Sequence, residues 1–136
     1  MSNESLKIRV GHSPDPDDAF MFYALTTGAL ETPGRIYEHF LVDIDTLNEE
    51  AKKGTYEVSA VSINSYPDVS HTYNLMNCGA SMGEGYGPIL ISKSKMSVEQ
   101  AKHTEIAIPG LSTSSYLALK LALGDVKVKE IPFDEI

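Results

Sequence analysis

Segments that favour strands alternate with segments that favour helices along the whole sequence. Apolar, β-branched runs typical of strands lie at residues 6–10, 37–42, 58–63, 75–82, 89–92, 105–108 and 126–131. The capping residues and apolar spacing of helices are found at residues 19–28, 45–54, 97–102 and 116–123. Strands separated by helices build a mainly parallel sheet with helices on both faces. The predicted fold class is therefore α/β with a mainly parallel sheet.

Polar residues at the predicted helix starts are candidates for N-caps. We expect Asp17 or Asp18 to cap the first helix and Thr46 to cap the second. Ser97 is the expected cap of the third helix, with Gln100 three residues later in the capping-box position.

Charge and cysteine content restrict the partners and the compartment. Lys and Arg number 11 against 19 Asp and Glu, which gives a formal net charge of -8. An acidic chain repels phosphate backbones, so no nucleic-acid partner is predicted. No stretch reaches the roughly 20 apolar residues of a membrane span, and no signal peptide is visible, so a cytoplasmic protein without a membrane partner is expected. Cys78, the one cysteine, indicates a reducing compartment, and its apolar neighbours predict a core position.

The loop at residues 110–115 is the most informative candidate site. It contains four consecutive hydroxyl residues between a predicted strand and a predicted helix. Ligands of open α/β sheets bind at the carboxyl ends of strands. Free N–H groups and the dipole at a helix start attract a carboxylate or phosphate. The sequence predicts a small-anion site here, and the alternative is that one hydroxyl simply caps the helix.

Other strand ends carry weaker signals. Residues 83–87 read Gly-x-Gly-x-Gly, which matches no phosphate-binding loop, and they form either a close backbone approach to a ligand or an ordinary bend. His12 lies at a strand end and is a possible cleft residue with Ser13 and Asp18, or a structural histidine. The aspartates at 15, 17 and 18 lack an EF-hand pattern, so no metal is predicted. No catalytic constellation has a recognisable spacing.

Four stretches carry a shared pattern, at residues 12–25, 58–62, 79–88 and 106–117. The third reads Gly-Ala-Ser-Met-Gly-Glu-Gly-Tyr-Gly-Pro, and the fourth begins Ile-Ala-Ile-Pro-Gly. In this order they resemble the futalosine-pathway family of menaquinone biosynthesis, nearer to its naphthoate synthase branch than to its chorismate dehydratase branch. The resemblance implies a type II periplasmic-binding-protein-like fold, in which two lobes close on a small carboxylated substrate. Residues 1–90 would form the first lobe and residues 91–136 the beginning of the second.

The resemblance also implies an activity and a set of binding residues. Members of this branch are lyase-type enzymes that convert cyclic dehypoxanthine futalosine to 1,4-dihydroxy-6-naphthoate without a cofactor. The residues that match the substrate-binding positions are Ser62, Asn64, Gly85, Tyr86, Gly87, Thr113 and Ser114. Thr113 and Ser114 would grip the substrate carboxylate.

The sequence departs from the family in two ways. Asp17 stands where the family often has Asn. Family members also continue well beyond the position of Ile136, and the histidine proposed as their base lies in that later part, so no catalytic residue is assigned here. Activity is expected only if a C-terminal part completes the fold. The alternative is a non-catalytic binding protein for a small carboxylate or oxyanion. An open edge strand at residues 126–131 predicts a homodimer or a second chain as partner.

Overall fold

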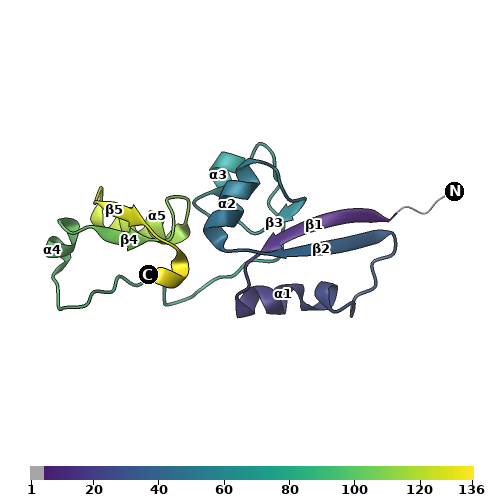
Figure 1. The fold of residues 1–136 in the computed structure, drawn as a ribbon, viewed down its shortest axis with the longest axis horizontal. Coiled ribbons are helices and arrows are strands. Elements are labelled where there is room, and N and C mark those ends of the chain that lie inside the picture. The colour runs from purple at the N-terminus through teal and green to yellow at the C-terminus, as the bar shows by residue number, and fades with distance from the viewer. Residues whose placement is uncertain (1–4) are drawn as a thin grey trace.

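The computed structural model describes residues 5–136, which form two small parallel sheets with helices around them (Figure 1). The first part contains β1 (Leu6–His12), α1 (Pro16–Thr26), β2 (Arg35–Leu41), α2 (Ile44–Lys52), β3 (Val58–Ser59) and α3 (Tyr66–Val69). The second part contains α4 (Val98–Lys102), β4 (Ile106–Ile108), α5 (Ser114–Leu123), β5 (Val128–Glu130) and the 3-10 helix η1 (Phe133–Glu135).

All strand pairs described in both sheets are parallel. The first sheet has the order β2-β1-β3, and its longest pairing joins β1 to β2 from Leu6 opposite Arg35 to His12 opposite Leu41. The second sheet pairs β4 with β5. In Figure 1, α1 lies on one side of the first sheet, and α2 and α3 lie on the other. The predicted α/β class with parallel strands is confirmed, although the strands form two sheets.

The core of the first part forms around the carboxyl-terminal half of β1. Val10, Leu47, Ala51 and Val69 are almost fully buried. At Gly11, an added Cβ would lie 2.7 Å from a Tyr56 ring carbon and 2.8 Å from a Leu47 methyl carbon. The glycine therefore lets α2 and the Tyr56 ring pack directly on the strand backbone. The second part has a smaller core of Ala101, Ile106 and Ile108.

The first two helices begin earlier than the sequence predicts, so their caps differ. Asp15 is at the N-cap position of α1 because Pro16 fits the first helical turn. The N-cap of α2 is Asp43, whose carboxylate accepts a hydrogen bond of 3.0 Å from the Thr46 N–H. The predictions of Asp17 or Asp18, and of Thr46, as caps are wrong.

In the second part, two of the predicted helix ends are confirmed and one is wrong. The capping box of Ser97 and Gln100 is confirmed at the start of α4. The last helix ends at Gly124 as predicted, where a φ of 78° favours glycine. It begins at Ser114, two residues before the predicted start, because Thr113 is the cap.

Two predicted strands, at residues 75–82 and 89–92, are absent from the described structure, and the run at residues 58–63 shortens to β3. The segment between α3 and α4 instead runs as an extended connection between the two sheets (Figure 1). Ile89, in the second of these runs, is 83% exposed. Cys78 is exposed as well, so its predicted core position is wrong. An apolar run forms a strand only where a neighbouring strand supplies hydrogen-bond partners.

Within residues 5–136, no helix combines the length and apolar character needed to cross a membrane.

Candidate functional site

A cleft of about 570 Å³ opens where the carboxyl ends of four strands meet. Ser13 follows β1, Asp43 follows β2, Pro109 follows β4 and Ile131 follows β5, and all four line the cleft. In Figure 1, both sheets direct these strand ends toward the middle of the molecule. The carboxyl edge of a parallel sheet is the usual ligand-binding edge. The cleft is therefore the strongest candidate binding site in shape.

The lining of the cleft is acidic. The carboxylates come from Asp15, Asp43, Asp45, Glu130 and Asp134, and the described lining residues include no Lys or Arg. Burial and the nearby Glu130 raise the pKa of Asp45. Burial also acts to raise the pKa of Asp43, but hydrogen bonds from Thr46 outweigh it and lower that pKa. These side chains favour hydrogen-bond donors and repel an anion.

A second group of polar residues joins α2 to the loops that follow β3 and β4. Asn48 is completely buried. Its carbonyl oxygen accepts a 2.8 Å hydrogen bond from the Ser62 N–H, and its amide donates to Ser62 Oγ at 3.1 Å and to the Ser112 carbonyl at 3.4 Å. One side chain thus binds both loops.

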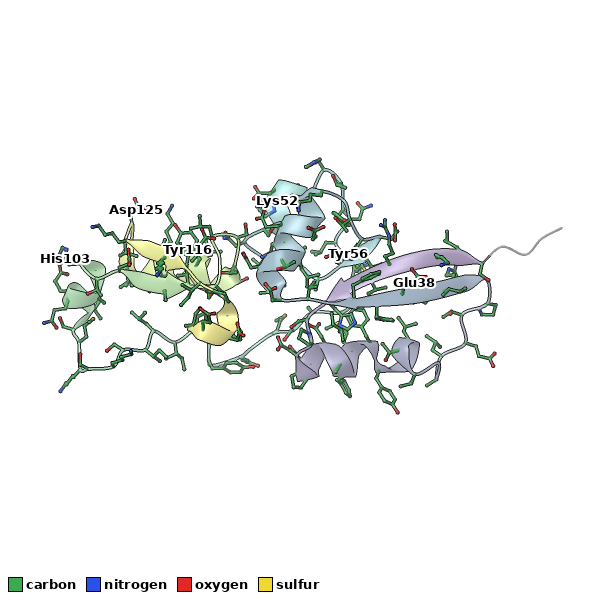
Figure 2. All side chains as sticks on the ribbon, viewed as in Figure 1. Glu38, Lys52, Tyr56, His103, Tyr116 and Asp125 are labelled. Carbon is green, nitrogen blue, oxygen red and sulfur yellow. The ribbon has the colours of Figure 1, made fainter. Side chains whose placement is uncertain are left out.

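Two further bonds connect the same loops. Asn64 donates a 3.0 Å hydrogen bond to the Leu111 carbonyl. Lys52, labelled on α2 in Figure 2, donates from Nζ to Ser112 Oγ at 3.1 Å and also pairs with Glu49. The structure therefore brings Ser62 and Asn64 to the loop at residues 110–115, the loop that also contains Thr113 and Ser114.

Sequence reasoning missed Asn48 and Lys52. They are four residues apart on α2, which places them on the same face of the helix. That spacing was a usable signal for a polar face turned toward another loop. It did not identify the loop, because contacts over 60 residues of sequence depend on the fold.

Thr113 acts as the N-cap of α5. Its buried hydroxyl accepts from the Tyr116 N–H at 3.3 Å, donates to the Gly110 carbonyl at 2.7 Å, and lies 3.0 Å from Ser115 Oγ. Ser114 is exposed at the first position of the helix. The capping alternative is thus realised at Thr113, and the gripping of a carboxylate by Thr113 and Ser114 stays a prediction.

The glycine-rich bend does not join this group in the described structure. Tyr86 is 77% exposed, and its ring lies beside Gly83, where an added Cβ would be 2.7 Å from it. Among residues 5–136, no hydrogen bond links Gly85, Tyr86 or Gly87 to the Ser62 loop or to the loop at residues 110–115.

The possible cleft residues near β1 have separate environments. Ser13 lines the cleft, donates its hydroxyl to Asp15 at 2.7 Å, and donates its N–H to the Asp18 carboxylate at 3.1 Å. Burial, followed by the charge of Asp17, raises the pKa of Asp18. The described part of the chain places no group of three or more His, Cys, Asp or Glu side chains to hold a metal ion.

Another concavity, of about 300 Å³, lies between α1 and the connection that follows α3. Asp17 lines it and accepts a hydrogen bond from the hydroxyl of Ser81. This bond lowers the pKa of Asp17. The cavity is small and has few polar groups in its lining, and none of the predicted binding residues lines it.

His12 is buried between the first sheet and α1, away from the cleft. Its ring stacks on Phe22 with centroids 4.4 Å apart. Nδ1 donates to the Ser13 carbonyl at 3.0 Å, and Nε2 shares a hydrogen bond of 3.0 Å with His39 Nδ1, in which either ring can be the donor. The bond between the two rings needs one nitrogen as acceptor, so it is lost when both rings carry a full set of protons. With both ring nitrogens engaged and the ring stacked on Phe22, His12 is a structural histidine in this arrangement.

The histidine pair is expected to make the protein less stable in acid. Burial, and then the charge of His12, lower the pKa of His39 below its ordinary 6.5. The unfolded chain therefore binds more protons below pH 6.5, and the free energy of unfolding falls as the pH drops through that value toward the folded pKa. Each tenfold difference in proton affinity is worth about 1.4 kcal/mol, reduced by solvent at this partly exposed site. Urea unfolding at pH 7 and pH 5 measures the loss.

His39→Asn provides the comparison for this prediction, because an Asn amide can donate from nearly the position of Nδ1 without titrating in this range. The variant is expected to lose less stability between pH 7 and pH 5 than the unmodified chain. His103→Asn, at an exposed position, is the matched control and is expected to change the difference little. Equal pH dependence in all three chains would contradict the assignment.

Comparisons with known proteins give a consistent result. The sequence model of a family described as menaquinone biosynthesis matches residues 8–136. The chain is 35% identical over 130 residues to a 1,4-dihydroxy-6-naphthoate synthase of Thermus thermophilus, covering 95% of this chain and 46% of that one. It is 30% identical to the Streptomyces coelicolor protein of the same name, covering 100% of this chain and 49% of that one. The chain spans about half the length of these relatives.

A solved structure has the same fold as this chain. The crystal structure of a protein from Archaeoglobus fulgidus superimposes with a TM-score of 0.88 at 45% sequence identity. The match covers 99% of this chain and 48% of that one. The arrangement of the two parallel sheets is therefore shared with a natural protein that is about twice as long.

Proposed function

Because the chain belongs to the menaquinone biosynthesis family, we propose that it forms part of an enzyme that converts cyclic dehypoxanthine futalosine to 1,4-dihydroxy-6-naphthoate. The observation that carries this proposal is the family match over nearly the whole chain. The chain matches about half the length of each naphthoate synthase relative. The activity is therefore proposed for the chain together with the remainder of the family's fold.

The proposed complete fold is a type II periplasmic-binding-protein-like pair of lobes. Residues 1–90 form the first lobe and residues 91–136 the beginning of the second. Two parallel sheets whose carboxyl ends turn toward one shared cleft support this arrangement. In this fold, a substrate is enclosed when the lobes close on it.

The proposed position of the substrate carboxylate is the start of α5. The acidic lining of the cleft disfavours a carboxylate there. The first N–H groups of a helix have no partners within the helix and favour an anion. Ser114 is exposed at this point, and the ammonium group of Lys52 lies 3.1 Å from Ser112 in the same loop. Ser62 and Asn64 contribute by holding this loop, and the bend at Gly85–Gly87 remains a proposed contact.

The activity test is incubation of the chain with cyclic dehypoxanthine futalosine, followed by mass spectrometry for dihydroxynaphthoate. One reaction contains the chain alone, and another adds a polypeptide corresponding to the unmatched part of the Thermus relative. Product in either reaction supports the enzyme. Substrate binding without product in both favours the alternative, a non-catalytic carboxylate-binding protein. Absence of both binding and product overturns the proposal.

The double substitution of Thr113→Ala and Ser114→Ala is expected to weaken binding of 1,4-dihydroxy-6-naphthoate, measured by titration calorimetry. Each hydrogen bond to a charged group is worth about 1.5–3 kcal/mol. Thr113→Ala alone should also lower the free energy of unfolding by about 1 kcal/mol, because it removes a helix cap. Ser114→Ala alone should affect binding with a change in stability within about 0.5 kcal/mol.

The matched control for these variants is Ser94→Ala, which removes an exposed hydroxyl from the connection before α4. It is expected to leave both affinity and stability unchanged. Unaltered affinity in the Thr113 and Ser114 double variant would remove this loop from the proposed site.

A further inference from the structure

The side chain of Asn48 makes contacts that the family match does not explain. Asn48 belongs to α2, whose buried face otherwise packs on the first sheet through Leu47 and Ala51. Its amide group instead reaches two loops at once. The amide oxygen accepts a 2.8 Å hydrogen bond from the Ser62 N–H. The amide nitrogen donates to Ser62 Oγ at 3.1 Å and to the Ser112 carbonyl at 3.4 Å.

An amide is well matched to this position. It has an acceptor for the Ser62 N–H and donors for two oxygens, whereas a carboxylate has acceptors only. A leucine of similar size would fill the space but leave the Ser62 N–H and the Ser112 carbonyl without partners. Buried polar groups without partners are costly. The position therefore demands an asparagine for its hydrogen bonds and not only for its volume.

The two loops held by Asn48 belong to different sheets. Ser62 follows β3 of the first sheet, and Ser112 follows β4 of the second. The bond of Asn64 to the Leu111 carbonyl and that of Lys52 to Ser112 Oγ lie at the surface of the same contact. Of these three bridging side chains, Asn48 is the buried one, so its bonds compete least with water.

We propose that Asn48 is a positioning residue. By hydrogen bonding it holds the loop after β3 against the loop at residues 110–115, and so orients the first turn of α5 toward the ligand. The inference rests on the proposed function for the identity of that ligand. Asn48 itself does not touch the ligand in this arrangement. It acts through the Ser112 carbonyl, which lies two residues before the exposed Ser114.

The first test uses Asn48→Asp, which keeps the acceptor for the Ser62 N–H and removes both donated bonds. At a temperature where circular dichroism shows a folded chain, we expect affinity for 1,4-dihydroxy-6-naphthoate to fall by tenfold or more. Asn77→Asp, at an exposed position, adds a carboxylate elsewhere and is expected to leave the affinity unchanged. Asn48→Asp with unchanged affinity would overturn the positioning role.

Hydrogen exchange gives a readout that does not depend on the ligand. In Asn48→Asp, amides of residues 110–116 are expected to exchange at least tenfold faster, while amides in the β1–β2 pairing keep their rates. A purely structural role would accelerate both regions together, and that result would overturn the inference. Lys52→Met removes a surface hydrogen bond to the same loop and should accelerate exchange of the loop amides by a smaller factor. It is the variant to measure if Asn48→Asp does not fold.

The two proposals fail in different ways. If the unmodified chain, with or without the remaining part of the fold, binds neither substrate nor naphthoate, the proposed function is wrong. The coupling of the two loops by Asn48 is then decided by the local pattern of hydrogen exchange. If the unmodified chain binds naphthoate and Asn48→Asp binds it equally well, the proposed function stands and the positioning role is wrong.

Discussion

Replacing Leu47 with alanine is expected to lower the free energy of unfolding by about 2–5 kcal/mol, the usual cost of a large-to-small substitution in a core. Leu47 is 0% exposed. It packs where β1 has only the backbone of Gly11, and an added Cβ at that glycine would meet a Leu47 methyl carbon at 2.8 Å. The Leu47 side chain therefore packs against the backbone of β1, which cannot move without disturbing the hydrogen bonds between β1 and its neighbouring strands. The cavity left by the substitution should collapse little.

Urea unfolding monitored by circular dichroism measures this loss. Leu121→Ala is the matched control, because Leu121 is also a helical leucine but is 79% exposed. Its effect should stay within about 0.5 kcal/mol. Similar losses in the two variants would mean that the first sheet lacks the core described here.

Gly110→Ala is expected to destabilise the chain by about 1–3 kcal/mol, as overpacking of a filled site does. An added Cβ would lie 1.8 Å from Asp45 Oδ1 and 2.2 Å from its carboxyl carbon. Asp45 is in the first turn of α2, so the new methyl group would force either this carboxylate or the whole loop to move. The loop is the one that presents Ser114, so the substitution should also weaken naphthoate binding.

A double-mutant cycle with Asp45→Ala isolates the cause. Removal of the carboxylate makes room for the methyl group, so the double variant should be more stable than the sum of the single effects by about 1 kcal/mol or more. Gly87→Ala is the control for stability, because nothing lies within 4 Å of a Cβ at that glycine and its φ is ordinary. Ser94→Ala, outside the proposed site, is the control for naphthoate binding. Additive effects in the cycle would show that the clash is not the source of the loss.

The sequence predicted the class of structure because local signals agreed along much of the chain. The β-branched run at the start became β1, and the capping box of Ser97 and Gln100 formed as expected. Gly124 ended the last helix. Each of these features depends on residues within a few positions of one another, which is the range over which capping and turn chemistry act.

The predictions that failed depended on distant neighbours. The apolar residues at 89–92 have strand character, but no strand within residues 5–136 pairs with them. Cys78 has apolar neighbours in sequence and is nevertheless exposed. Apolar character shows a tendency to be buried, and the fold decides whether a burying surface is present.

The candidate site divides in the same way. The hydroxyl-rich loop at residues 110–115, and Ser62 and Asn64 by family resemblance, were identified from the sequence. The structure brings them together and adds Asn48 and Lys52. It also shows that Thr113 is engaged as a cap, that His12 is buried against Phe22, and that the cleft at the strand ends is acidic.

By itself, the sequence of this protein determined most of the alternation of strands and helices, the capping box of α4, the glycine that ends α5, and the family to which the chain belongs. Only the tertiary structure decided that the strands divide into two sheets and that Asn48 joins the loops between them. The physical reason is range. Propensity and capping act between residues close in sequence, whereas the bonds of Asn48 to Ser62 and Ser112 span 14 and 64 positions and exist only after the chain has folded.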